Sequence, residues 1–325
     1  LEGFSEYLSG EERKAEAKDK APQAYRAEIV KDNEDDINDR FYGNPNVMVD
    51  EDAPLHGTHV AGIIAAKRNN GLGMDGVADN VKIMMLRAVP DGDEHDKDIA
   101  LAIHYAVDNG ARVVNMSFGK DFSPGKKWVD EAVKYAESKN VLLIHAAGND
   151  HKNLDSAANF PNGEIIESKS RASNWITVGA SSDPSAESDF KSYTASFSNY
   201  GKKEVDVFAP GTKIYSTVPG GSNYRNLQGT SMASPVVAGV AALIMSYNPQ
   251  LTAEQVKWVI EKSSTPLPSK VKLPGSEDSM VQLSDISITG GVVNAYEALK
   301  LAATLRTTDN KNKLPKSSIK KNTKG

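Results

Sequence analysis

A serine, a histidine and an asparagine in this chain stand in sequence surroundings that suit acyl-group chemistry. Ser231 belongs to a Gly-Thr-Ser-Met-Ala-Ser-Pro string that starts at Gly229 and leads into an apolar segment typical of a buried helix. A serine at a helix start lies beside free backbone N–H groups and the positive end of the helix dipole, which can hold a developing oxyanion. We expect Pro235 in the first turn, where its missing N–H matters little. Taken alone, Ser231 also fits an ordinary helix N-cap.

His56 opens a His-Gly-Thr-His-Val-Ala-Gly string. A neutral imidazole there can accept the proton of a serine hydroxyl and return it to a leaving amine. We expect Gly57 and Gly62 to let the following helix pack closely while His56 stays at its exposed start. We interpret His59 as structural, because a zinc peptidase would need a His-Glu-x-x-His string, which the sequence lacks.

Asn149 closes an Ala-Ala-Gly-Asn string that begins at Ala146, at the end of the apolar segment 141–147. An amide at the end of a strand can donate a hydrogen bond to a tetrahedral oxyanion. Taken alone, an asparagine after glycine is an ordinary turn residue. Its interpretation therefore depends on the two other strings.

Alternating strands and helices must position these three residues. Apolar segments predict strands at 81–89, 113–116, 141–147, 175–180 and 205–209. Helical spacing of apolar residues predicts helices at 56–67, 96–109, 128–139, 232–247, 252–262 and 292–303, with Thr252 as an N-cap. Strands separated by helices predict an α/β fold, a three-layer, doubly wound and mostly parallel sheet with helices on both faces. Sites in such sheets form beyond the carboxyl ends of the strands.

The composition excludes several classes of protein. Apolar residues make up 39% of the 325 residues, enough for a sizeable core, and the absence of cysteine excludes disulfides and thiolate metal sites. A net charge of −5 argues against a broad nucleic-acid-binding surface. The longest apolar run, 236–245, is too short to span a bilayer, so no membrane span is expected.

Charge and composition divide the chain into three parts. Residues 1–55 hold 15 acidic and 7 basic residues, which predicts an acidic insertion or N-terminal extension with a helix at 5–30 and an irregular loop at 32–55. Residues 56–305 carry the strings and the alternating elements. Residues 306–325 are predicted to be a disordered basic tail. Within the middle part, the proline-containing segment 263–290 is expected to be irregular, and no role is assigned to it.

Taken together, the three strings resemble the subtilisin-like serine peptidases, over a stretch from His56 to Lys262. An Asn-Met-Ser-Phe-Gly string ending at Gly119 and an Asp-Val-Phe-Ala-Pro-Gly string starting at Asp206 add to the resemblance. The resemblance implies a subtilisin-like fold and hydrolysis of peptide bonds through an acyl-enzyme intermediate. It makes His56 the general base and Ser231 the nucleophile. Asn149 and the Ser231 N–H would form the oxyanion hole.

The same resemblance implies a substrate site, a substrate class and a location. Ser117, Phe118 and Gly119 would pair with the substrate backbone and, with Ala146, Ala147 and Gly148, would line the pocket for the side chain before the scissile bond. Phe118 as a plain core residue is the alternative. The partner would be a polypeptide substrate, no cofactor would be required for the chemistry, and the protein would be extracellular, periplasmic or at the cell surface.

One residue of the family pattern is absent. The family places its catalytic aspartate upstream of the histidine, in an Asp-Ser/Thr-Gly string after an apolar strand, and residues 1–55 contain no such string. Asp32 follows only a short apolar pair and is a weak substitute. In one hypothesis an upstream segment of the same precursor supplies the aspartate and this chain is a fragment lacking it. In the other the chain is a catalytically impaired pseudo-peptidase that binds polypeptides.

A glycine-rich loop at 69–78 resembles the loop that binds calcium in some members of the family. Calcium prefers six to eight oxygen ligands, and this loop alone offers too few. A structural calcium ion and a plain glycine-rich turn therefore both stay open as interpretations.

Overall fold

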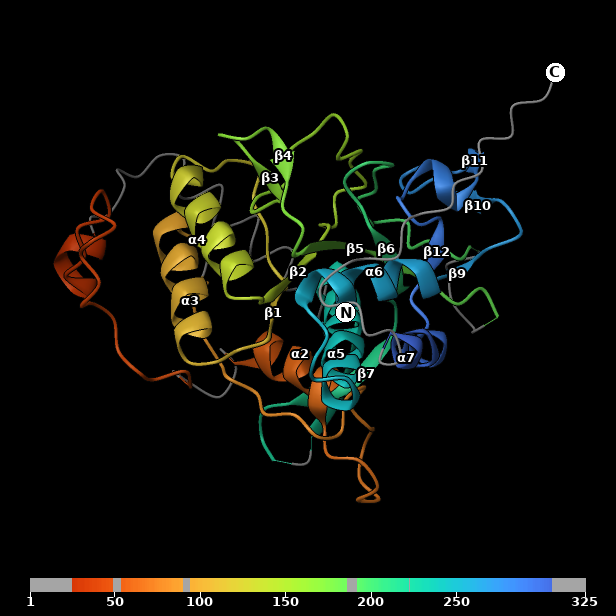
Figure 1. The fold of residues 1–325 in the computed structure, drawn as a ribbon, viewed down its shortest axis with the longest axis horizontal. Coiled ribbons are helices and arrows are strands. Elements are labelled where there is room, and N and C mark those ends of the chain that lie inside the picture. Colours follow the sequence, from red (N-terminus) through yellow and green to blue (C-terminus); the bar gives the residue numbers. More distant parts are fainter. Residues whose placement is uncertain (1–24, 49–53, 90–93, 186–191, 222, 306–325) are drawn as a thin grey trace. The chain divides into compact units, whose positions relative to one another are not determined.

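A computed structural model describes residues 25–48, 54–89, 94–185, 192–221 and 223–305 (Figure 1). The chain falls into two compact units, Leu1–Asn46 and Val47–Gly325. The described part of the first unit holds a short π-helix at Arg26–Val30 followed by turns. Most of the helix expected at 5–30 and the whole basic tail expected at 306–325 lie outside the described residues. The domain boundaries expected from the sequence remain predictions.

A six-stranded, mostly parallel sheet organises the second unit, with strand order β1-β2-β5-β6-β12-β9. Only β9 runs antiparallel to its neighbour. The strands are β1 (Val113–Met116), β2 (Leu142–Ala146), β5 (Trp175–Ser181), β6 (Val207–Pro210), β12 (Gly291–Val292) and β9 (Thr265–Pro266). The expected parallel α/β sheet is confirmed, because apolar segments that are buried on both faces need helices on both sides.

Helices cover both faces of this sheet, which gives the expected three layers (Figure 1). On one face α4 packs over β2, and α3 packs against α4. On the other face α5 crosses four strands, and α2, α6 and α7 pack around it. The helices are α2 (Leu55–Ala65), α3 (Asp96–Asp108), α4 (Lys126–Ser138), α5 (Thr230–Tyr247), α6 (Ala253–Ser263) and α7 (Ala295–Thr304). Thr252 caps α6 as expected, in a capping box with Gln255.

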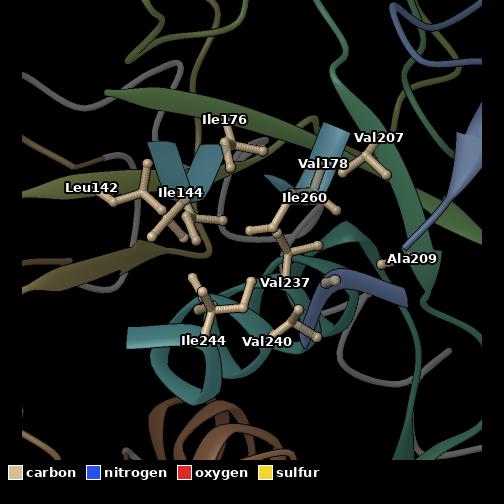
Figure 2. Packing of buried hydrophobic residues seen from close by; sticks show 14 of the residues in the cluster. Leu142, Ile144, Ile176, Val178, Val207, Ala209, Val237, Val240, Ile244 and Ile260 are labelled. Atoms are coloured by element: carbon tan, nitrogen blue, oxygen red, sulfur yellow. The ribbon is translucent and has the colours of Figure 1, made fainter. Parts of the chain in front are cut away.

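The main core lies between α5 and the sheet (Figure 2). Leu142 and Ile144 on β2 and Ile176 on β5 are fully buried there. They meet Val237 and Ile244, which lie on one face of α5. By length and apolarity, α5 is the one helix among the described residues that could cross a membrane, but 72% of it is buried inside the protein. Its apolarity is therefore accounted for by its place in the core.

The strand expected at 81–89 is wrong. Residues 81–89 have no regular secondary structure, and Ile83, Met84 and Met85 are 42%, 42% and 45% exposed. The segment has the composition of a strand but pairs with no neighbouring strand in the described part of the chain, and strand structure requires a hydrogen-bonded partner. Within the described segments the sheet ends instead at β1, three of whose four residues are only half-buried.

Short hairpins were not foreseen from the sequence. These are β3 (Glu164–Ile165) with β4 (Ser170–Arg171), β7 (Ile214–Val218) with β8 (Asn223–Leu227), and β10 (Val271–Lys272) with β11 (Met280–Val281). The segment 263–290, expected to be irregular, therefore contains β9 and the β10–β11 hairpin. Their strands are short or polar, so hydrophobic alternation gives little signal.

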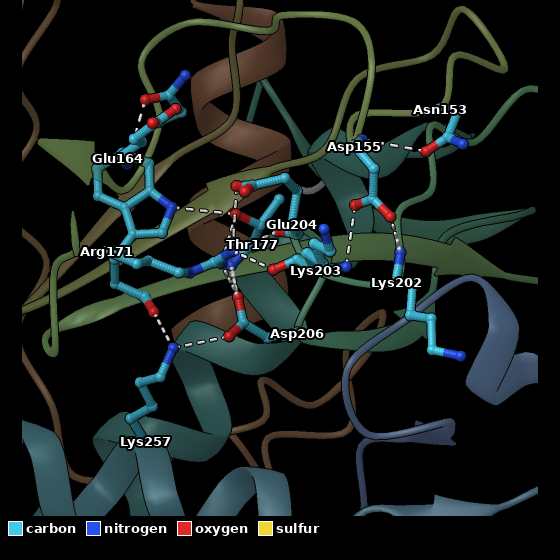
Figure 3. Close-up of polar contacts among 12 residues, drawn as sticks. Asn153, Asp155, Glu164, Arg171, Thr177, Lys202, Lys203, Glu204, Asp206 and Lys257 are labelled. Atoms are coloured by element: carbon cyan, nitrogen blue, oxygen red, sulfur yellow. Dashed lines mark hydrogen bonds and ion pairs between the residues drawn. The ribbon is translucent and has the colours of Figure 1, made fainter. Parts of the chain in front are cut away.

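A buried carboxylate fastens α6 and the β4 strand to the sheet (Figure 3). Asp206 is fully buried and accepts hydrogen bonds from the Arg171 guanidinium, from Lys257 Nζ at 2.7 Å and from the Thr177 N–H at 2.6 Å. Burial alone would raise the pKa of Asp206, but the charges of Lys257 and Arg171 outweigh it and hold that pKa below its ordinary value.

Replacing one partner of this cluster is expected to destabilise the fold. Lys257→Met leaves the buried carboxylate with only one cation and should lower the free energy of unfolding at pH 7 by about 3 kcal/mol. Because the folded pKa of Asp206 is depressed, its stabilising contribution is present above the unfolded pKa, about 3.9, and is lost as the pH falls through the folded value. The difference from the unmodified chain should therefore shrink below pH 4.

Urea unfolding of both proteins at pH 7 and at pH 3.5 measures this difference. Lys262→Met, at an exposed position of the same helix, is the matched control and should change the unfolding midpoint little. An equal effect of the two substitutions at pH 7 would contradict the assigned role of the cluster.

Candidate active site

Ser231 lies in the first turn of α5, half-buried, with its side chain next to the end of β1. Its hydroxyl donates to the Ser117 carbonyl at 3.2 Å, and the Ser117 hydroxyl donates in return to the Ser231 carbonyl at 2.9 Å. This exchange joins the start of α5 to the segment that follows β1. It also means that the proton of the Ser231 hydroxyl points to Ser117 rather than to a histidine.

Pro235 explains why the Ser231 carbonyl accepts a side-chain hydrogen bond. It was expected in the first turn, but α5 begins at Thr230, so Pro235 lies inside the helix. A proline has no N–H to give to the carbonyl four residues earlier, which here belongs to Ser231. The Ser117 hydroxyl takes the place of that missing donor.

His56 is the second residue of α2, and the β7–β8 hairpin packs against this helix. Thr217 and Ser216 on β7 donate through their hydroxyls to the carbonyls of Thr58 and His59, at 2.9 and 2.8 Å. Gly62 allows the close approach, because a Cβ there would lie 2.1 Å from the Thr217 hydroxyl oxygen. The expectation for Gly62 thus fits the structure.

His59 is fully buried one turn after His56, and its Nε2–H lies 3.0 Å from both the Ile214 and the Arg225 carbonyl oxygens. These two carbonyls belong to opposite strands of the hairpin. His59 therefore ties α2 to the hairpin, as its structural interpretation anticipated. In the described part of the chain no group of three or more histidine, cysteine, aspartate or glutamate side chains is arranged to hold a metal ion.

The His56 ring is set up as a neutral base. His56 is exposed at the start of α2, as expected, yet the protein packed around the ring still lowers its pKa from the ordinary value, and the nearby His59 lowers that pKa further. Neither influence comes from a carboxylate. Asp32, the weak candidate for the missing aspartate, is buried in the first unit and pairs with Arg26. Among the described residues of the second unit, no carboxylate therefore raises the pKa of the imidazole.

Asn149 and the Ser231 N–H lie on the same side of Gly229. The Asn149 side-chain oxygen accepts from the Thr230 N–H at 2.8 Å and from the Thr230 hydroxyl at 3.0 Å, which leaves its Nδ2 group facing away from these donors. A Cβ placed on Gly229 would lie 3.5 Å from Asn149 Nδ2 and 3.6 Å from the Ser231 nitrogen. The same point lies 3.7 Å from Asn149 Oδ1, and because residue 229 is a glycine with φ +146°, no side chain stands between the two nitrogens.

A cavity of about 330 Å³ adjoins these donors. Of the residues expected to line a substrate pocket, Phe118, Gly119, Ala146 and Gly148 do so, together with Asn149 and Ser231. The remaining wall comes from the residues Val89, Glu94, Asp150, Asn159 and Thr230. Strand ends β1 and β2 meet the first turn of α5 here, at the carboxyl edge of the sheet, as expected for a parallel α/β fold.

Two expected pocket residues lie behind the wall instead. Ala147 is fully buried, and its carbonyl accepts from Asn159 Nδ2 at 2.9 Å and from Asn199 Nδ2 at 2.8 Å. The Ser117 hydroxyl is engaged with the Ser231 carbonyl and with the Ser234 hydroxyl, at 2.9 and 2.8 Å. Ala147 and Ser117 therefore lie behind the cavity-lining residues and hold them in place through hydrogen bonds.

Asn159 is one of the cavity-lining residues that sequence reasoning missed. Its Nδ2 bonds to the Ala147 carbonyl, while its Oδ1 would lie 2.5 Å from a Cβ at Gly119. Asn159 thus links the Ala147 side of the cavity to the Gly119 side, and position 119 has no room for a side chain. Glu94 was also missed; it is 4% exposed and precedes α3. Neither residue belongs to a string with a chemical signature, so tertiary packing alone brings them here.

The loop at 69–78 closes on itself through side-chain hydrogen bonds. The Asp75 carboxylate accepts the Asn69 N–H at 3.1 Å, and the Asn70 side chain accepts the Leu72 N–H at 2.9 Å. Asn69 and Gly71 have positive φ angles, 56° and 72°. These turns suit both interpretations of the loop, so a calcium ion here stays a prediction.

Comparison with known proteins agrees with this geometry. Residues 17–289 match the Subtilase family of peptidases. Thermitase of Thermoactinomyces vulgaris is 36% identical over 276 residues, which are 83% of this chain and 85% of thermitase. The thermophilic serine proteinase of Bacillus sp. (strain AK1) is 44% identical over 192 residues, 59% of this chain. The chain spans 42% of that proteinase's length and 25% of that of the cell wall-associated protease of Bacillus subtilis (strain 168).

Solved structures show the same fold. A protease from Pseudoalteromonas arctica superposes with a TM-score of 0.59 at 30% identity, over 76% of this chain and 70% of its own. The self-cleaved protease domain of PatA superposes with a TM-score of 0.57 at 26% identity, over 77% of this chain and 83% of its own. From the match over residues 17–289, this chain belongs to the subtilase family.

Proposed function

We propose that this chain carries the catalytic machinery of a serine endopeptidase that cleaves polypeptides through an acyl-enzyme intermediate. The single observation that carries the proposal is the pair of donors around Gly229, Asn149 Nδ2 and the Ser231 N–H, beside the Ser231 hydroxyl and an open cavity. An arrangement of this kind stabilises the oxyanion that forms when a hydroxyl attacks a carbonyl. The relatives named above are proteases, which supports the same reaction class.

In the proposed reaction the Ser231 hydroxyl turns from the Ser117 carbonyl to His56, and the neutral imidazole accepts its proton. The serine oxygen then bonds to the substrate carbonyl carbon, whose oxygen becomes negatively charged between Asn149 and the Ser231 N–H. Collapse of this adduct breaks the C–N bond, and the imidazolium returns the proton to the leaving amine. Water, activated by the same imidazole, then hydrolyses the ester and restores the serine.

The substrate is a polypeptide, one of whose side chains enters the cavity beside Phe118. The chemistry requires no cofactor, and a calcium ion at the loop 69–78 would serve structure alone. We place the protein outside the cytoplasm or at the cell surface. One relative is named as cell wall-associated, which supports this location.

The aspartate that completes the site is supplied, we propose, by an apolar strand outside the described residues. Two features support this proposal. β1 ends the sheet with an edge that pairs with no strand in the described part of the chain. On α2, which carries His56, the backbone of Gly57 lies close to an exposed apolar side chain, because a Cβ placed there would be 3.0 Å from Met85 Cε. An added parallel strand could pair with the β1 edge, and an aspartate at its carboxyl end would then stabilise the His56 imidazolium.

A fluorophosphonate probe tests the nucleophile directly. The chain should be labelled on Ser231, as read by mass spectrometry of the intact protein and its peptides. Ser231→Ala should abolish labelling, whereas Ser246→Ala, at an exposed serine of the same helix, should leave it unchanged. A folded protein whose Ser231 stays unlabelled would overturn the proposal and favour a polypeptide-binding pseudo-peptidase.

The pH dependence of labelling reports on His56. Because the pKa of His56 is lowered from 6.5 and the neutral ring is the active form, the labelling rate should fall with decreasing pH through a midpoint below 6.5. NMR titration of the His56 ring gives the pKa independently. A midpoint above pH 7 in this chain alone would show that a carboxylate already faces the ring.

A complementing peptide tests the missing strand. A synthetic peptide with a run of five or so apolar residues followed by Asp-Ser-Gly, added in excess, should accelerate labelling of Ser231 by about 10³-fold or more. In a related enzyme of this family, loss of the aspartate alone costs roughly 3 × 10⁴ in kcat. The same peptide with Asn in place of Asp is the control. Equal acceleration by both peptides, or by neither at saturation, would contradict the proposal.

A further inference from the structure

A buried histidine that the proposed reaction does not use lies directly behind the cavity wall. His145 is on β2, the strand that leads to Asn149, and its side chain is 1% exposed. Its Nε2 lies 2.7 Å from the Phe118 carbonyl oxygen. A carbonyl can only accept a hydrogen bond, so Nε2 carries the proton and donates it. Burial lowers the pKa of His145 to about 4, so the ring is neutral near neutral pH.

The hydrogen bond from His145 to Phe118 lies just beyond the last backbone pair of β1 and β2, where the cavity wall formed by Phe118 and Gly119 begins. The ladder between β1 and β2 ends at the pair Met116 and His145. The next backbone anchor is Lys120, which exchanges two hydrogen bonds with Phe160 at 2.8 and 2.9 Å. Between these anchors, the His145 side chain supplies a bond to the backbone of Phe118, a residue that lines the cavity.

Aromatic packing fixes the direction of the imidazole. The Trp175 ring on β5 lies 5.5 Å from the ring of His145, and the Phe118 ring lies 6.3 Å away on an edge. Trp175 is fully buried and donates from its indole nitrogen to the Thr177 hydroxyl at 3.0 Å. The histidine therefore cannot turn away from the Phe118 carbonyl without disturbing the core of the sheet.

We propose that His145 is a positioning residue that holds the Phe118–Gly119 wall and thereby determines which substrate side chain the cavity accepts. The inference rests on the proposed function, because it concerns the pocket of that same site. An aliphatic residue on β2 would satisfy the core but would leave the Phe118 carbonyl unpaired and the wall free to shift. The His145 N–H holds the Phe118 end of the wall in place. Asn159 holds the Gly119 end, because it bonds to the Ala147 carbonyl and lies directly against Gly119.

Peptide binding tests the proposal without requiring turnover. In a Ser231→Ala background, the dissociation constants of two peptides that differ only by Ala or Phe before the scissile bond give a selectivity ratio. His145→Leu should change this ratio by about tenfold, because the wall loses its anchor. His145→Gln keeps an N–H donor of similar reach and should stay within about twofold. His104→Leu, which removes a histidine stacked on Tyr135 of α4, is the control and should leave the ratio unchanged.

The outcomes separate the two proposals. If the Ser231→Ala protein binds neither peptide, the proposed function fails and the specificity role falls with it. If it binds both but His145→Leu keeps the original ratio, or if Leu and Gln change it equally, the positioning role alone is wrong. Should His145→Leu fail to fold, NMR decides: the His145 Nε2–H signal should persist from pH 5.5 to 8.5 and shift when peptide binds. A proton on Nδ1, or no shift, would overturn the role.

Discussion

The position of the nucleophile depends on the burial of α5 against the sheet. Val237, Ala241 and Ile244 recur along one face of this helix and are fully buried. Each large aliphatic side chain buried in this way contributes roughly 1.5–3 kcal/mol. Because the packing fixes both the rotation and the depth of the helix, its first turn ends at the carboxyl edge of the strands. The hydrogen bonds from Thr230 to the Asn149 side-chain oxygen then bring the two donors around Gly229 together.

The base reaches the site by a different route. His56 sits on α2, and the β7–β8 hairpin holds that helix through hydroxyl groups and His59. α2 also packs against α5. Val77, whose N–H bonds to the Ile63 carbonyl of α2, lies against a glycine of α5, because a Cβ on Gly239 would be 2.6 Å from Val77 Cβ. The nucleophile is thus placed by apolar burial and the base by polar contacts. A change in either kind of contact would alter the distance between them independently.

The sequence predicted the parts of the fold whose pattern is local. The helical periodicity of α3 and α5 and the apolar runs of β2 and β5 placed these elements within a few residues. The sequence failed where structure depends on a partner, because 81–89 has the residues of a strand but pairs with no strand that the structure describes. Pro235 was misplaced because the exact helix start depends on how Thr230 bonds to Asn149, which no local pattern encodes.

In the candidate site, too, the sequence predicted only the residues that stand in a local pattern. His56, Asn149 and Ser231 stand in strings whose residue types suggest a role, whereas Asn159 and His145 act through contacts that form only after folding. The family resemblance assigned Ala147 to the pocket together with Ala146 and Gly148. Alternation along the backbone turns its carbonyl toward Asn159 and Asn199 instead. Sequence patterns therefore identified the reacting groups better than their supports.

The open edge at β1 also bears on the behaviour of the chain in concentrated solution. Among the described residues β1 pairs with β2 alone, and Ile83, Met84 and Met85 add exposed apolar surface elsewhere in the same unit. A strand edge of this kind can recruit a strand from a second molecule as readily as one from its own polypeptide. Colloidal stability and freedom from edge-to-edge aggregation would thus be set by whatever occupies that edge.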